Sequence, residues 1–157
     1  MSMIIYRLAT IDDVEALAML RTEFLGEISK KQGPHPELIE ALKLYFTRAL
    51  PTGEFAAYLA EVDRSIVATS GFVYYRHPPS FKNMGGCEGY VMNMYTLPTW
   101  RGQGIGTILL GKLIEHSRQN NCCRISLHAM PEAQPLYRRM GFVPSEGEMR
   151  LDLREAP

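Results

Sequence analysis

The sequence of 157 residues predicts a single domain of the mixed α/β class. Its hydrophobic pattern switches repeatedly between a period of two residues and a period near 3.6 residues, which indicates strands and helices in alternation. A strand-forming run also passes through a glycine-rich stretch, 97–107, directly into a helical pattern. No linker, repeat or low-complexity segment divides the chain, and its length is sufficient to bury one hydrophobic core.

The expected elements follow the order β-α-α-β-β-β-α-β-α-β. Thr10 followed by Asp13 predicts the start of the first helix, because a polar cap with a carboxylate three residues later satisfies free N–H groups. Asp63-Arg64 is the expected turn of a β-hairpin. The predicted elements are a strand at 4–9, helices at 10–25 and 38–49, a hairpin at 54–75, a strand at 88–96, a helix at 103–120, a strand at 124–129, a short helix at 131–140 and a last strand at 149–153.

Composition and charge narrow the functional classes. The 17 basic and 17 acidic residues cancel, so net charge recruits neither nucleic acid nor an anionic membrane. No apolar run reaches the length of a membrane span, and the first residues do not resemble a signal peptide. Cys87, Cys122 and Cys123 have no metal-ligand spacing, and their odd number fits reduced thiols. We therefore expect a cytoplasmic protein without a metal site.

The glycine-rich stretch is the most informative motif in the chain. Gly102, Gly104 and Gly106 occupy alternate positions between a strand and a helix. Backbone N–H groups at the start of a helix attract anions, and glycine allows a close approach. The spacing is neither that of a dinucleotide-binding fold nor that of a P-loop. The stretch predicts a phosphate-binding site, or alternatively a turn that only lets the helix leave the sheet.

Two motifs resemble the GNAT superfamily of acetyl-CoA-dependent N-acetyltransferases. Arg101-Gly102-Gln103-Gly104-Ile105-Gly106 fits the diphosphate loop [Q/R]-x-x-G-x-[G/A], and 133–142 fits the second signature A-x-x-L-Y-x-x-x-G-F. The resemblance implies a central mixed, mostly antiparallel sheet flanked by helices on both faces. The sequence departs from the family at Met130, where many members have an asparagine that contacts the cofactor.

The resemblance also implies how acetyl-CoA binds. Its pantetheine arm would run along Met94, Tyr95 and Thr96 like an added strand, and a backbone N–H near Met94 or Tyr95 would stabilise the oxyanion at a strand bulge. Asn93 would orient the substrate or hold that bulge in place. The residues expected to hold the diphosphate are Arg101, Gly102, Gln103, Gly104, Ile105, Gly106 and Thr107.

Acetyl transfer to an amine needs a base and an acid. An alkylamine with a pKa of roughly 10.4 must lose a proton, and Glu88 is the expected base; it could instead be an exposed glutamate at a strand start. His128 is a second base candidate, with a structural role as its alternative. The leaving thiolate, with a pKa of about 8.5, needs a weak acid. Tyr137 occupies the family's general-acid position; its alternative role is to close the edge of the core.

The acceptor is expected to be a primary amine of a small molecule or peptide. Tyr75, Arg76 and His77, together with 30–36 and 145–147, are expected to form its pocket, although such residues are also common on ordinary surfaces. The competing function is a non-catalytic CoA-binding domain, and no residue pattern supports a thiol enzyme. Members of the superfamily are often dimers, so the resemblance leaves a homodimer open.

Overall fold

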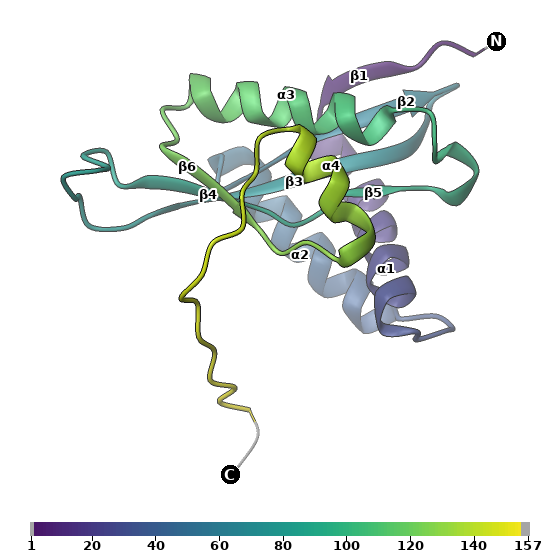
Figure 1. Cartoon of the computed structure of the whole chain (residues 1–157). Helices are drawn as coiled ribbons and strands as arrows, with labels where there is room; N and C mark the ends of the chain where they lie inside the picture. Colours follow the sequence, from purple (N-terminus) through teal and green to yellow (C-terminus); the bar gives the residue numbers. More distant parts are fainter. Residues whose placement is uncertain (1, 155–157) are drawn as a thin grey trace.

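A computed structural model describes residues 2–154 and shows one sheet with helices on both sides (Figure 1). The strands are β1 (Ile5–Leu8), β2 (Phe55–Val62), β3 (Ser65–Arg76), β4 (Cys87–Val91), β5 (Tyr95–Thr96) and β6 (Arg124–Leu127). The α-helices are α1 (Val14–Ser29), α2 (Pro36–Thr52), α3 (Ile105–Gln119) and α4 (Gln134–Arg139). Within this part of the chain, no helix has both the length and the apolar character of a membrane span.

The sheet is mixed and mostly antiparallel, as predicted. Its strand order is β1-β2-β3-β4-β6, and β5 pairs with β3 beyond the end of β4. Only β4 and β6 are parallel to each other. Helices α1 and α2 cover one face and α3 and α4 the other, so the expectation of helices on both faces is confirmed (Figure 1).

Apolar side chains from each helix pair fill the space against the sheet. Burial of such side chains stabilises a fold by roughly 25 cal/mol per Å² of apolar surface. On the α1–α2 face the fully buried members include Leu17, Ala18, Phe46, Ala49 and Phe55. On the α3–α4 face they include Phe72, Ile105, Leu109, Leu110 and Leu113.

The strand predicted at 88–96 is interrupted, and this interruption shapes the site. Phe72 of β3 pairs with Val91, and Thr69 pairs with Tyr95. Between these two pairs β3 has two residues, 70 and 71, whereas the facing chain between β4 and β5 has three, 92–94. The extra residue makes a one-residue bulge. Beyond it β5 stays on β3, whereas the pairing of β4 with β6 ends at Leu127, so the sheet splits between β5 and β6.

The strand predicted at 149–153 is wrong. Residues 143–150 have no regular structure, and the C-terminal segment runs away from the sheet on the side of α1 and α2 (Figure 1). Met149, Leu151 and Leu153 are 94%, 83% and 87% exposed. An alternating pattern needs a neighbouring strand and a surface to bury its apolar face, and this segment has neither. Its charged side chains pair locally instead, as in the contact of Arg150 with Glu148.

A buried carboxylate joins β1 to the start of α1. Asp13 is only 6% exposed and accepts two hydrogen bonds of 2.8 Å from the Arg7 guanidinium. The Thr10 N–H also donates to it at 2.7 Å, which confirms the predicted helix start. The hydrogen bonds from Arg7 are the main reason that the pKa of Asp13 is lowered. Arg7 reaches Glu61 of β2 as well, at 2.7 Å.

We expect Asp13→Asn to lower the free energy of unfolding by about 1–3 kcal/mol at pH 7, since it leaves Arg7 without its buried partner. Because folding lowers the pKa of Asp13, its contribution is full above the unfolded value of about 3.9 and is lost as pH falls through the folded value. The difference from wild type should therefore shrink below about pH 4. Urea denaturation at several pH values measures it, with Asp12→Asn as the exposed control. An equal loss in both variants would contradict the prediction.

Candidate active site

The glycine-rich loop leaves an open seat at the start of α3. Gly102 and Gly104 both have φ of +77°, a conformation that favours glycine, and no atom lies within 4 Å of the position that a Cβ would take at either residue. The first helical bond runs from the Ile108 N–H to the Gly104 carbonyl at 3.2 Å. The N–H groups of 104–107 therefore precede the helical ladder and are available to an anion. This open space therefore suits an anionic group such as a phosphate.

Arg101 anchors this loop to the rest of the domain. Its guanidinium makes two hydrogen bonds to Glu27 of α1, at 3.0 and 2.8 Å, and its Nε donates to the Thr96 carbonyl at 2.9 Å. It also lies over the Tyr95 ring, 5.5 Å from the ring centre. These contacts hold the loop against α1 and β5. Gln103 and Thr107 are exposed beside the open seat.

The split in the sheet lies next to this seat. A Cβ at Gly106 would be 3.9 Å from both the Met94 side chain and the Leu136 side chain, so the start of α3, the bulge and α4 meet at one place. Tyr95 and Thr96 pair with β3 on one edge only. Among the described residues, the Met94 N–H donates no hydrogen bond. An acyl chain lying in the split would find this donor free.

Tyr137 lies on the α3–α4 side of the split. It is 8% exposed and packs in the cluster that contains Phe72 and Val91, with its ring centre 5.7 Å from that of Phe142. Burial raises the pKa of its phenol above the ordinary value of 10.0. The hydroxyl makes no hydrogen bond to any residue in 2–154. It is therefore a protonated and uncommitted donor at neutral pH.

Glu88 is buried at 7% exposure, so the alternative of an exposed glutamate is wrong. Its Oε2 accepts from the Tyr75 hydroxyl at 3.4 Å and lies 3.4 Å from His77 Nε2, and its Oε1 lies 3.4 Å from Arg124. The structure thus brings Glu88, the expected base, together with Tyr75 and His77, which were expected to line the acceptor pocket. Arg76 points elsewhere and donates to the Gly85 carbonyl at 3.4 Å.

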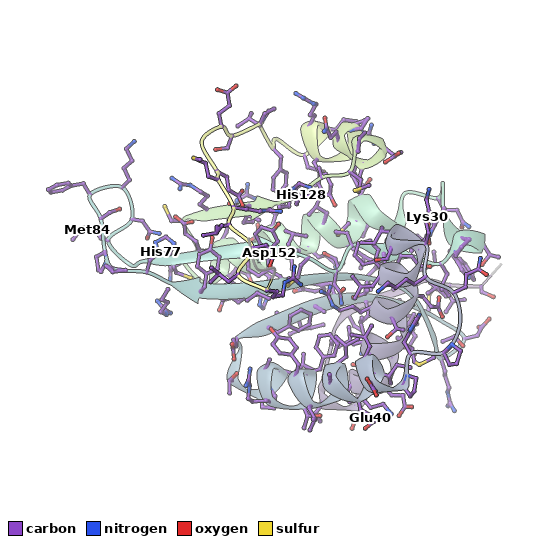
Figure 2. The ribbon with its side chains drawn as sticks, turned by 90° about the horizontal axis from the view of Figure 1, so that it is seen from below. Lys30, Glu40, His77, Met84, His128 and Asp152 are labelled. Atoms are coloured by element: carbon purple, nitrogen blue, oxygen red, sulfur yellow. The ribbon has the colours of Figure 1, made fainter. Side chains whose placement is uncertain are left out.

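Glu88 and His128 share a face of the sheet but lie at different depths. In-register pairing places Arg124 beside Glu88, and alternate residues of β6 and its extension share that face. Glu88 is four residues before the bulge, which corresponds to roughly 13 Å along a strand. His128 follows Leu127, the last residue of β6 that pairs with β4, and is exposed at the split itself. Figure 2 views this face, with His77 on the long hairpin that extends beyond α1 and α2.

Asn93 of the bulge is fully buried and contacts a residue that the sequence analysis did not select. The Arg21 guanidinium of α1 donates to Asn93 Oδ1 at 2.9 Å and to the Met92 carbonyl at 3.2 Å. The Asn93 amide nitrogen has no hydrogen-bond partner. Arg21 interrupts the apolar stripe of α1, and a charge at such a position was the available signal. Residues 30–36 and 145–147 do not line the pocket beside Asn93.

Comparison with known proteins identifies the family. A profile described as the acetyltransferase (GNAT) family matches residues 19–142, most of the chain. The chain belongs to this family. It is therefore an acyltransferase that uses acetyl-CoA as cosubstrate and transfers the acetyl group to an amine, in agreement with both sequence motifs and with the open seat at α3. No group of three or more potential metal-ligating side chains occurs in residues 2–154.

Several relatives support the assignment. A predicted acetyltransferase from Clostridium acetobutylicum, solved with acetyl-CoA, is 32% identical and superposes with a TM-score of 0.87; the match covers 98% of this chain and 99% of that one. A glucosamine 6-phosphate N-acetyltransferase from Oryza sativa subsp. japonica is 26% identical over 86% of this chain and 82% of its own. The enzyme of the same name from Trypanosoma brucei brucei is 35% identical over 75 residues, and this match spans only about half of that protein, 51%.

Gly104→Glu places a carboxylate in the open seat, and we expect it to weaken CoA binding by roughly 100-fold or more because it repels the diphosphate. Gly33→Glu is the matched control, since Gly33 also has a positive φ, of +102°, but lies in the exposed loop between α1 and α2. Calorimetric titration with CoA measures the affinities, and circular dichroism confirms folding. Normal affinity in Gly104→Glu would refute the assignment of this seat.

Proposed function

We propose that the chain acetylates a primary amine of a small molecule by direct attack within a ternary complex. The supporting observation is the split between β5 and β6: Tyr137 lies on one face of the sheet, and the other face has His128 at the split and Glu88 farther along the strands. An acid and a base on opposite sides of one gap can serve the leaving group and the attacking group at the same time. A domain that only binds CoA would not require this arrangement.

When bound, acetyl-CoA supplies the activated acetyl group as a thioester. The seat at 104–107 would hold its diphosphate, and the free edge at Tyr95 and Thr96 would align its pantetheine arm. The Met94 N–H, which is free at the bulge, would donate to the thioester carbonyl oxygen, the atom that gains negative charge during attack. All of these contacts would be made by backbone groups. The side chains at these positions therefore matter only because they determine the local backbone conformation.

Removal of the amine proton would take place on the α1–α2 face. At roughly 13 Å from the bulge, the Glu88 carboxylate cannot touch the reacting nitrogen and would act through water. Tyr75 and His77 orient this carboxylate and link it to solvent. His128 lies closer to the split and provides a second route. On the other face, Tyr137 would return a proton to the thiolate.

A panel of primary amines tests the proposal through the release of free CoA thiol from acetyl-CoA. The panel includes glucosamine 6-phosphate, because two relatives carry its name, together with α-amino acids, polyamines and short peptides. We expect thiol release above the amine-free rate with a small amine and none with peptides. If the protein binds acetyl-CoA but none of the amines raises thiol release above the amine-free rate, the non-catalytic CoA-binding alternative is correct.

Tyr137→Phe removes the proposed acid while retaining the ring that packs in the core. We expect kcat to fall by roughly 10²-fold or more with little change in acetyl-CoA affinity. Tyr6→Phe, on β1, is the control. Steady-state kinetics with acetyl-CoA titration separates the two effects. An unchanged kcat, with the chemical step shown to limit the rate, would remove Tyr137 from the mechanism.

The proposal includes a cytoplasmic location, supported by three cysteines that form no disulfide in the structure: Cys87, Cys122 and Cys123. A homodimer remains a prediction from the family resemblance. Light scattering of the purified protein measures the oligomeric state directly.

A further inference from the structure

A pocket of about 310 Å³ lies between α1, α2 and the sheet, next to the bulge. Ligand pockets usually measure about 300–1,000 Å³, so this one suits a ligand of few atoms. Its walls are mostly apolar, and the polar groups are confined to Arg21, Asn93 and the Tyr45 hydroxyl. The apolar lining consists of Leu42, Phe46, Phe55, Val73 and Met92, together with the Tyr45 ring.

Arg21 is the only charged group in this lining and has no carboxylate partner among the described residues. Both of its hydrogen bonds come from Nη1, so Nη2 and Nε donate to no other residue in 2–154. Burial lowers the pKa of Arg21, as is expected for a partly buried cation without a carboxylate partner. A cation in this state favours an anionic ligand.

Asn93 provides an independent observation at the same place. It is 0% exposed and lines the pocket, and its Nδ2 is a buried donor without a partner. Buried polar groups are nearly always hydrogen-bonded, so this donor has an unmet hydrogen bond that an acceptor on a ligand could supply. Its Oδ1 already accepts from Arg21, which fixes the amide orientation. Because the two side chains are hydrogen-bonded to each other, the free donors of Arg21 and Asn93 lie close together in the lining of an otherwise apolar pocket.

We infer that this pocket selects the acceptor, and that the acceptor is an α-amino acid with an apolar side chain whose carboxylate binds Arg21 and the Asn93 amide. The inference rests on the proposed function and specifies its substrate class. The apolar side chain fills the space between α1, α2 and β3. A sugar phosphate fits less well, because its hydroxyl groups would be buried without partners against the apolar walls.

The distance between the two ends of the acceptor also favours an α-amino acid. Asn93 would hold the carboxylate, and the next residue, Met94, carries the N–H proposed for the thioester carbonyl. The Cα atoms of consecutive residues are about 3.8 Å apart, so the carboxylate at Asn93 and the thioester carbonyl at Met94 would be close neighbours. The nitrogen that attacks this carbonyl must therefore lie close to the carboxylate. A single carbon separates these groups in an α-amino acid. The ammonium group would first lose one proton to the proposed base. The neutral nitrogen would then form a bond to the acetyl carbon, the bond from that carbon to sulfur would break, and the second proton lost by nitrogen would balance the one that the thiolate gains.

Three amines with the same isobutyl group test the inference in the wild-type enzyme. Leucine carries the carboxylate, leucinamide replaces it with a neutral amide, and isoamylamine lacks the group. We expect kcat/KM for leucine to exceed that for isoamylamine by roughly 10²-fold or more. Arg21→Met should lower kcat/KM for leucine by a similar factor and change that for isoamylamine by less than about threefold. Arg21→Lys, which keeps the charge but loses the planar fork, should be intermediate.

Arg48→Met is the matched control, since Arg48 lies over the Tyr45 ring from α2 but does not line the pocket. A structural role for Arg21 would lower activity with leucine and isoamylamine equally, which would overturn the inference. Turnover of isoamylamine equal to that of leucine in the wild type would overturn it as well, without any variant that might fail to fold.

Calorimetric titration of leucine into the CoA-saturated protein separates the inference from the proposed function. Turnover of glucosamine 6-phosphate without leucine binding would overturn the inference and leave the proposed function intact. Leucine binding that is lost in Arg21→Met, with no turnover of any amine, would retain the pocket assignment and overturn the proposed function.

Discussion

The close approach of β3 to the bulge is the contact on which the site depends. A Cβ at Gly71 would lie 2.4 Å from the Asn93 Cβ and 2.8 Å from the Phe55 ring, distances that packed atoms do not reach. Only glycine therefore lets β3 pass beneath a buried Asn93. With Asn93 seated there, the extra residue of the bulge is accommodated, the Met94 N–H is left without an acceptor, and β5 departs from β6.

The split makes the two faces of the sheet chemically different. The α3–α4 face is apolar and tightly packed near the split: a Cβ at Gly89 would lie 1.7 Å from the Phe72 ring, and Tyr137 packs in the same cluster. The α1–α2 face carries Glu88 with its polar neighbours and the exposed His128. A neutral phenol in an apolar environment retains its proton, whereas a carboxylate linked to solvent can pass one on. The packing thus separates the proposed acid from the proposed bases across one sheet.

The sequence predicted local structure well wherever a short segment determines its own conformation. The glycine loop, the Asp63-Arg64 turn and the Thr10 cap depend on neighbouring residues, and all three have the predicted form. The bulge was implied only by the family resemblance, because it arises from the register of two strands. The strand predicted at 149–153 was wrong for a related reason. Alternating apolar residues indicate which side of a strand would be buried, but they do not indicate a neighbouring strand with which it could pair. Arg21 was missed because its partners, Met92 and Asn93, are distant in the sequence and meet it only in the folded chain.

Helix α1 connects the two halves of the proposed ternary complex. Arg21 lines the acceptor pocket, and Glu27, six residues later and roughly 9 Å along the helix, holds Arg101 of the diphosphate loop. Arg101 in turn binds the Thr96 carbonyl at the free strand edge. A single rigid helix therefore fixes the distance between the anion-binding end of the pocket and the loop that would seat the cosubstrate. Because both contacts are made by charged side chains of α1, a rotation of this helix would displace acceptor and cosubstrate together.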